Sequence, residues 1–314
     1  MRQTDRQARR PRPPAVVVGL TAVALLVAIA ALLAARPKRD EDPLQQRVRA
    51  FAASIPGPGS DGYDVPTRDE AARLQAVYRA LLHGRLGRAT VLARPLRYAV
   101  RAEDHPTLGP LLLLSERRSA DGSWPHAWGL HIHASRAPTP ATIEVTHPRA
   151  DRLTERVGVE AFVAAGAANL LIAGSHRRAN ENGEADVAHR SDSALQAVHQ
   201  AVLQPEARVV QIHGFEAGDR PDRYGDAVVS SGDAPAGALA RAMAHALRKR
   251  GLRVCLYDGD PCSGLAATTN VQGRSARAAG AQFAHVELSA RVRREPRLRR
   301  AAVDAIAGAL RAHR

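Results

Sequence analysis

Three side chains that could hold a metal ion follow two apolar, strand-like segments. His147 follows the segment TIEVT, Asp151 comes four residues later, and His213 follows the segment RVVQI. Two histidines and one carboxylate form a ligand set that zinc accepts, with a fourth position left for water or substrate. The pattern therefore predicts a catalytic zinc site at the ends of two strands.

The carboxylate ligand of this predicted site could be either of two residues. Asp151 lies in the turn that follows His147, and Glu155 lies four residues further on. We expect Asp151 to bind the metal, because Glu155 falls inside a helix predicted to begin near Thr154.

A further acidic side chain lies in the apolar segment QFAHVELS. Alternation along a strand places Phe283, His285 and Glu287 on one face. An unpaired buried carboxylate is costly, so a glutamate at this position needs a reason. We expect Glu287 to act as a general base that takes a proton from water.

These residues need a sheet to bring them together. Short apolar runs joined by helical segments are typical of an α/β fold whose sheet is covered on both faces. We predict a mixed, largely parallel sheet with helices on both faces, and a site at the carboxyl ends of its strands. The expected strands are Arg97–Arg101, Pro110–Ser115, Trp128–Ala134, Thr142–Thr146, Asn169–Ala173, Arg208–Ile212, Ala227–Ser230, Arg253–Tyr257 and Phe283–Leu288, and the expected helices are Thr67–His83, Thr154–Ala165, Asp192–Leu203, Pro235–Arg250 and Pro296–Arg311.

Several segments between about residues 140 and 290 resemble one family. THPRADRLTE, VVQIHGF, TTNVQGR and GAQFAHVELSARVRR occur in this order. They are similar to segments of the zinc-dependent amidohydrolases with a carboxypeptidase-like fold, the group of phage poly-γ-glutamate hydrolases and N-formylglutamate amidohydrolases. The resemblance implies Zn²⁺ bound by His147, Asp151 and His213, with Glu287 as the catalytic base. The first turn departs from the family, which often has glycines and a glutamate there.

An acidic amide substrate would require cationic and polar side chains near the metal. Loops close to the strand ends supply the candidates Arg177, Asn180, His189, Asn270 and Arg274. Arginine binds carboxylates through two parallel hydrogen bonds. Asparagine amides could orient or polarise the scissile carbonyl.

The N-terminal region has the pattern of a membrane anchor. Ala15–Ala35 is 21 residues without a charge, enough to cross a hydrocarbon core of about 30 Å. Five arginines precede it, which predicts a cytoplasmic N-terminus. We expect a basic cytoplasmic segment at 1–14, a transmembrane signal-anchor at 15–35, a linker at 36–66 and an exported α/β hydrolase domain at 67–314. Cleavage after this segment would instead give a secreted protein.

Charge and cysteine usage restrict the alternatives. The net charge of +14 comes from arginine concentrated near both ends of the chain, and aromatic residues make up only 4%. Proteins that bind nucleic acids often stack bases on aromatic side chains. The low aromatic content therefore argues against nucleic-acid binding. Cys255 and Cys262 bracket a short turn-rich loop, and outside the cytoplasm they could form a disulfide.

We therefore expect a membrane-anchored, exported zinc hydrolase that cleaves an amide or peptide bond of a small molecule, peptide or polymer. Its substrate could be γ-glutamyl, N-formyl or carboxypeptidase-like. One alternative is an amidase that acts on peptidoglycan. Another is an inactive, membrane-tethered binding module whose basic C-terminal helix contacts anionic surfaces.

Overall fold

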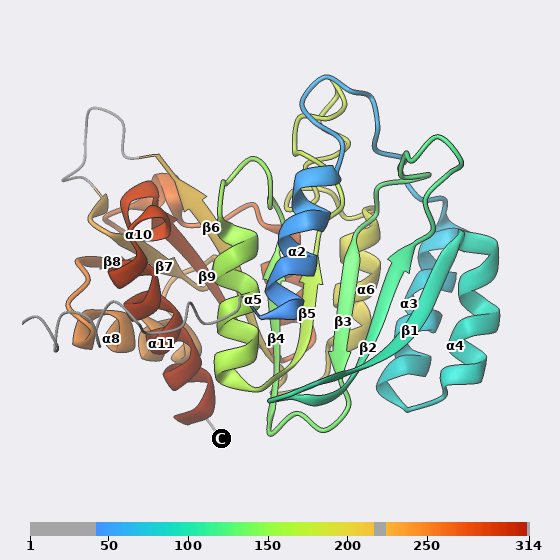
Figure 1. The fold of residues 1–314 in the computed structure, drawn as a ribbon. Coiled ribbons are helices and arrows are strands. Elements are labelled where there is room, and N and C mark those ends of the chain that lie inside the picture. The colour runs from blue at the N-terminus through green and yellow to red at the C-terminus, as the bar shows by residue number, and fades with distance from the viewer. Residues whose placement is uncertain (1–41, 217–223, 313–314) are drawn as a thin grey trace, which may run out of the picture. The chain divides into compact units, whose positions relative to one another are not determined.

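The structure is a computed structural model that describes residues 42–216 and 224–312. The described residues from Pro43 onward belong to one compact unit, built on a nine-stranded sheet with the order β1-β2-β3-β5-β4-β6-β9-β7-β8 (Figure 1). The expected cytoplasmic segment and membrane anchor lie outside the described residues. Within the described ranges, no helix has the length and hydropathy needed to cross a membrane.

All nine expected strands are present, with ends that differ by a few residues. They are β1 (Tyr98–His105), β2 (Gly109–Glu116), β3 (Leu130–Ala134), β4 (Thr139–Val145), β5 (Ala167–Ile172), β6 (Arg208–Phe215), β7 (Ala227–Ser230), β8 (Val254–Leu256) and β9 (Gln282–Ser289).

The sheet is mixed, as predicted, but only part of it is parallel. Strands β5, β4, β6 and β9 form a parallel centre, and β7 and β8 also pair in parallel. Strands β1, β2 and β3 extend this centre in antiparallel pairing on one side, and β7 pairs antiparallel with β9 on the other. The short turn between β1 and β2 leaves no room for the crossover that a parallel pair needs.

The five expected helices are present, and in the described residues four other α-helices join them. The helices are α2 (Pro43–Ser54), α3 (Arg68–Leu82), α4 (Leu86–Ala93), α5 (Thr154–Ala165), α6 (Ala194–Val202), α8 (Ala238–Lys249), α9 (Val271–Ala278), α10 (Ala290–Arg294) and α11 (Pro296–Ala312). Thr67 caps α3 through a reciprocal pair of hydrogen bonds with Glu70, as the spacing of these two residues indicates.

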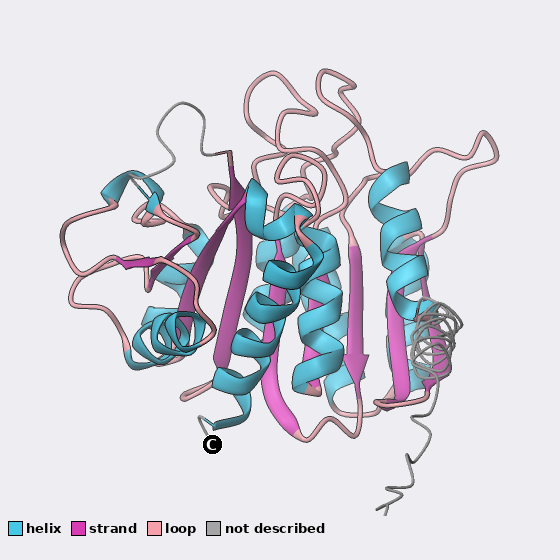
Figure 2. Cartoon of the chain, turned by 60° about the vertical axis from the view of Figure 1, so that its left-hand side comes forward, coloured by secondary structure: helices cyan, strands magenta, loops and turns pink. Residues whose placement is uncertain are grey.

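Helices cover both faces of the sheet. Side chains alternate between the two faces along each strand, so the core consists of two apolar layers, one on each face. Helices α2, α5, α8 and α11 pack on one face, where Ile143 and Val145 of β4 point. Helices α3, α4 and α6 cover β2 and β5 on the other face. Loops gather at the end of the sheet where the central strands finish (Figure 2). Residues at that end can therefore approach one another across several strands.

The range 36–66, expected to be a linker, contains the helix α2. Leu44, Val48 and Phe51 are buried against the first helical layer, and their spacing of four and three residues puts them on one side of a helix. The glutamines and arginines between these three residues give the segment a polar composition, and for this reason the sequence suggested a linker. The compact unit accordingly begins at Pro43 rather than at residue 67.

The basic segment 291–300 is not a uniform cationic surface. Arg293 is 1% exposed and donates hydrogen bonds to three backbone carbonyl groups. Arg299 is also buried and pairs with Glu160. These two guanidinium groups hold the end of β9 and helix α11 in place, so they are not free to contact an anionic surface.

Candidate metal centre

The turn between β4 and α5 builds the first half of the site. Pro148 cannot continue the strand ladder, and the N–H group of Asp151 donates to the carbonyl of His147 at 2.9 Å. This turn brings the two side chains together, with 3.4 Å between Asp151 Oδ2 and His147 Nδ1. Helix α5 then begins at Thr154.

The second half comes from the parallel strands β6 and β9. His213 is in register with Glu287, and both point away from the core layer that contains Ile212 and Val286. Strand β6 was expected to end at Ile212, but pairing with β9 extends it to Phe215, so His213 lies inside the ladder. Glu287 and His285 share the face predicted from the alternation of β9.

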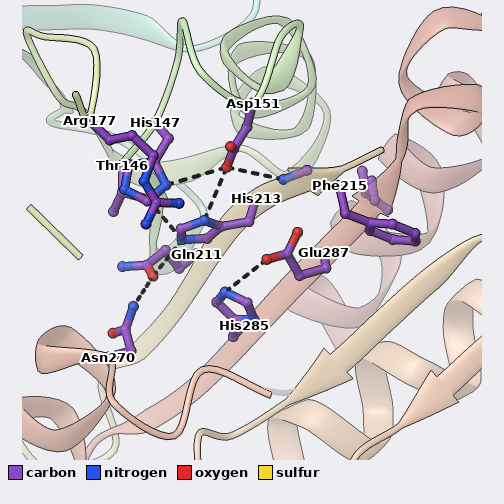
Figure 3. Close-up of polar contacts among 12 residues, drawn as sticks. Thr146, His147, Asp151, Arg177, Gln211, His213, Phe215, Asn270, His285 and Glu287 are labelled. Carbon is purple, nitrogen blue, oxygen red and sulfur yellow. Dashed lines mark hydrogen bonds and ion pairs between the residues drawn. The ribbon is translucent and has the colours of Figure 1, made fainter. Parts of the chain in front are cut away.

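The carboxylate of Asp151 lies between the two imidazole rings (Figure 3). Its Oδ2 atom is 3.2 Å from His213 Nδ1. The potential ligand atoms of His147, Asp151 and His213 all lie within 4.8 Å of one another, and all three side chains are largely buried. Burial alone would raise the pKa of Asp151, but the two histidines beside it outweigh burial and hold that pKa well below its usual range.

Asp186 orients His147. Its Oδ1 atom is 2.9 Å from His147 Nε2, and Arg177 and His189 contact the same carboxylate. Because a carboxylate accepts hydrogen bonds, Nε2 carries a proton, and Nδ1 is the ring nitrogen that faces Asp151 and is available to a metal. In the sequence, Asp186 lies three residues before the candidate His189, in the loop after β5.

The arrangement around His147 fits a bound cation. Its Nδ1 atom is fully buried and has no hydrogen-bond partner within the described part of the chain. A metal cation between Nδ1 and the Asp151 carboxylate would bind to both and so satisfy this buried nitrogen. Two imidazole nitrogens and one carboxylate oxygen are ligands that Zn²⁺ accepts, so the site fits Zn²⁺.

Glu155 lies outside this group of ligand atoms. It occupies the first turn of α5, where it is buried and its Oε2 atom has no partner in the described residues. Burial raises its pKa to about 7. The geometry brings Asp151, and not Glu155, to the two histidines.

Glu287 faces the same space from the neighbouring strand. Its Oε1 atom is 3.7 Å from His285 Nε2, and no partner of its Oε2 atom is found in the described ranges. Burial, with a contribution from the charge of Asp151, raises the pKa of Glu287 to about 8. A carboxyl group that titrates near neutral pH can both take up and return a proton.

His213, His285 and Glu287 form a second group of possible ligands. It shares His213 with the first group, and Nδ1 of that ring already faces Asp151. One imidazole nitrogen serves one metal ion, so the second group offers only two further donors. Zn²⁺ needs at least three protein ligands, and the first group supplies them.

A cavity of about 250 Å³ opens onto these side chains. His147, His213 and Glu287 line it, and loop residues 263–265 and 267–270 form part of its wall. A larger cavity of about 490 Å³ lies between α2 and the β1–β3 side of the sheet, but its lining contains no histidine or cysteine. The cavity with the candidate chemistry is therefore the smaller one.

Three of the five predicted substrate-binding residues line this cavity: Arg177, His189 and Asn270. The other two do not. Asn180 lines a different cavity, and its amide bonds to the backbone of Tyr63 and to Glu184. Arg274 is exposed on α9.

Asn270 has both ends of its amide engaged. Its Oδ1 atom accepts from the N–H group of Gly273 at 2.8 Å as the N-terminal cap of α9. Its Nδ2 atom donates to Gln211 Oε1 at 2.6 Å. The expected role of polarising a substrate carbonyl would require breaking one of these bonds.

Cys255 and Cys262 form a disulfide, as their spacing predicted. The bond closes a loop directly before Ser263–Leu265, which lines the cavity. The disulfide therefore ties down one part of the cavity wall.

Fold and site together define a mixed α/β protein with a buried His–Asp–His centre that fits Zn²⁺. No family model matches the sequence, and no curated protein matches it.

Several solved structures are similar to the chain. A bacteriophage poly-gamma-glutamate hydrolase is 15% identical, with a TM-score of 0.37 over 54% of this chain and 83% of that one. A metallo-carboxypeptidase from Burkholderia cenocepacia is 15% identical, with a TM-score of 0.37 over 74% and 67%. An aspartoacylase family protein from Mesorhizobium loti is 15% identical, with a TM-score of 0.38 over 67% and 70%. Similarity at this level carries no functional assignment.

Proposed function

We propose that this chain is a zinc-dependent hydrolase that cleaves an amide or peptide bond. One observation carries the proposal. His147, Asp151 and His213 converge at a cavity whose wall also contains Glu287. Three buried ligands beside an acidic group that titrates near neutral pH are the parts that metal-assisted hydrolysis requires.

The ligands in this proposal are His147, Asp151 and His213, with Asp186 holding His147 in the required tautomer. When bound, Zn²⁺ would polarise the scissile carbonyl and make water more acidic. Glu287 accepts the proton from the attacking water and delivers it to the leaving nitrogen. Its place on β9, in register with His213, supports this role because both groups face the same small volume.

Arg177 is the group proposed to recognise an acidic substrate. It lines the cavity and already binds the carboxylate of Asp186, and guanidinium groups suit carboxylates. We propose γ-glutamyl, N-formyl or C-terminal peptide amides as the substrate class. A cavity of about 250 Å³ has room for roughly eight groups the size of a water molecule, which is enough for the atoms around a scissile bond.

The test combines metal analysis with a substrate panel on the purified full-length protein. We expect about one zinc per chain and hydrolysis of at least one member of a panel of γ-glutamyl peptides, N-formylglutamate, C-terminal peptides and peptidoglycan. Activity on peptidoglycan alone would replace the proposed substrate class and keep the zinc chemistry. Absence of bound zinc, together with no hydrolysis after zinc is added, would refute the proposal.

We further propose that the domain is extracytoplasmic and anchored by residues 15–35. The arginines before this segment and the Cys255–Cys262 disulfide support this topology. A reporter fused after Arg314 should be active only outside the cytoplasm, and the chain should fractionate with membranes. Recovery of a full-length chain with reduced cysteines from the cytosol would refute it, and recovery as a shortened soluble protein would indicate cleavage.

A further inference from the structure

A buried amide lies directly behind His213. Gln211, two residues earlier on the same face of β6, is fully buried. Its Oε1 atom is 2.9 Å from His213 Nε2 (Figure 3). An amide in this position costs free energy unless all its hydrogen-bonding atoms are used. The question is whether its neighbours dictate which end of the amide faces the histidine.

Asn270 fixes the amide of Gln211 from one side. The backbone N–H group of Gly273 donates to Asn270 Oδ1, and a backbone N–H group can only donate. The other end of Asn270 must then be Nδ2, which donates to Gln211 at 2.6 Å. The Gln211 atom that receives this hydrogen bond has to be its oxygen, Oε1.

Glu144 fixes the same amide from the opposite side. Gln211 Nε2 donates to Glu144 Oε2 at 3.0 Å. The other oxygen of Glu144 is 2.7 Å from His199 Nδ1, and both side chains are fully buried. A carboxylate accepts hydrogen bonds, so it requires the nitrogen of Gln211 to face it. The two neighbours therefore impose the same orientation independently.

This orientation determines the tautomer of His213. Because Gln211 presents its oxygen, His213 Nε2 must carry the hydrogen, and the hydroxyl group of Thr146 at 2.8 Å can accept it as well. The other ring nitrogen, Nδ1, is the atom that faces Asp151, so it is the nitrogen that a metal bound to Asp151 would meet. A histidine binds a metal through the nitrogen without hydrogen.

We propose that Gln211 is a positioning residue of the metal centre. Its amide, locked by Asn270 and Glu144, holds His213 as the Nε2–H tautomer and presents Nδ1 to the metal. The two ligand histidines are thus oriented by different groups, His147 by the carboxylate of Asp186 and His213 by this locked amide. The inference rests on the proposed function in that it takes His213 as a zinc ligand.

The fixed orientation of the Gln211 amide, here called the lock, is tested with Gln211→Met. This variant keeps the length of the side chain and removes its polar atoms. We expect zinc affinity, measured by chelator competition on the full-length protein, to fall by about 10- to 100-fold. Gln196→Met is the matched control. Gln196 is buried in the same polar layer and, in the described structure, is joined to Gln211 through Gln272 and makes no direct hydrogen bond to Gln211 or His213. The zinc affinity of Gln196→Met should therefore stay within about threefold of wild type.

A spectroscopic measurement reads the tautomer itself. In zinc-free wild-type protein at pH 8, the ¹⁵N shifts of His213 should report hydrogen on Nε2. In Gln211→Met they should report a mixture of tautomers. The wild-type measurement needs no variant, so it remains decisive if Gln211→Met does not fold.

The possible outcomes separate this inference from the proposed function. A His213 that carries its hydrogen on Nδ1 in the wild-type protein, or a Gln211→Met protein with wild-type zinc affinity and tautomer, overturns the lock while zinc binding stands. A wild-type protein that binds no zinc but shows the Nε2–H tautomer overturns the proposed function and supports the lock.

Discussion

His213 and Glu287 lie side by side on neighbouring parallel strands, in register, and both side chains face the cavity. Parallel pairing fixes their separation through the backbone, since both residues belong to continuous ladders and not to loops. A candidate metal ligand and a candidate base are thus held together by the most rigid part of the fold. The carboxylate of Asp151 approaches His213 from the turn between β4 and α5.

Replacement of Glu287 by glutamine should separate catalysis from metal binding. Loss of a general base typically lowers the rate by about 10²- to 10⁴-fold, and we expect kcat to fall within this range. Zinc content should stay unchanged, because Glu287 is outside the His147–Asp151–His213 group. Glu155→Gln, at another buried carboxyl group, serves as the control and should keep its kcat. Near-normal turnover of Glu287→Gln on the substrate that wild type cleaves would remove Glu287 from the mechanism.

Two alanine variants decide which carboxylate holds the metal. Asp151→Ala should abolish stoichiometric zinc binding, because Oδ2 of Asp151 faces both histidines. Glu155→Ala should retain zinc, since Glu155 lies in the first turn of α5 and outside the ligand group. Zinc per chain after gel filtration gives the answer, and the opposite pattern would assign the ligand to Glu155.

Asp186→Asn should weaken zinc binding without removing any direct ligand. The amide cannot accept from His147 with the strength of a carboxylate, and partners of this kind typically contribute about 10- to 100-fold in metal affinity. The zinc dissociation constant should rise by that factor while the circular dichroism spectrum stays the same. Asp192→Asn is a suitable control, because Asp192 pairs with Arg190 and is not part of the site. Equal affinity for Asp186→Asn and wild type would show that His147 does not need this partner.

His131 should make the fold sensitive to acid. It is fully buried on β3, both ring nitrogens lack partners in the described structure, and burial lowers its pKa from 6.5 to about 3. As pH falls below 6.5, His131 binds a proton in the unfolded chain but stays neutral in the folded chain. The free energy of unfolding therefore decreases between pH 6.5 and about 3. The loss from this residue should reach about 3 kcal/mol at about pH 4.5.

His131→Leu should remove that component of the pH dependence. Urea unfolding of both proteins at several pH values would give the difference in the free energy of unfolding, which should move in favour of the variant by about 2 kcal/mol between about pH 6.5 and 4.5. Parallel curves for the two proteins would mean that His131 is protonated or solvated in the folded state.

Local patterns in the sequence were enough to predict the elements that carry the site. Apolar runs and helical spacing gave the nine strands and five of the helices, because burial imposes those periods directly. The turn after β4 and the alternating face of β9 also follow from local rules, and they predicted that Asp151 would approach His147 and that Glu287 would share a face with His285. The spacing of Cys255 and Cys262 indicated their disulfide.

Other features depended on contacts between residues far apart in the chain. The role of Asp186 has no sequence signature, because it is defined by a hydrogen bond to His147 on another part of the chain. Gln211 lies only two residues before His213, but its orientation is set by Glu144 and Asn270, which are far away in the sequence. Asn180 and Arg274 looked suitable by residue type, yet the paths of their loops and helices take them away from the cavity. Helix α2 was not predicted because its composition is polar, and its apolar residues Leu44, Val48 and Phe51 are recognised only by their packing against the sheet's helical layer.

The sequence by itself determined which residue types stand at the strand ends, because that depends on the order of apolar and polar residues. Only the tertiary structure decided that Asp151, and not Glu155, meets both histidines, and that an amide and a carboxylate lie behind them. The physical reason is that strand order and register are fixed by packing over the whole sheet, and a distance of a few ångströms between side chains depends on both.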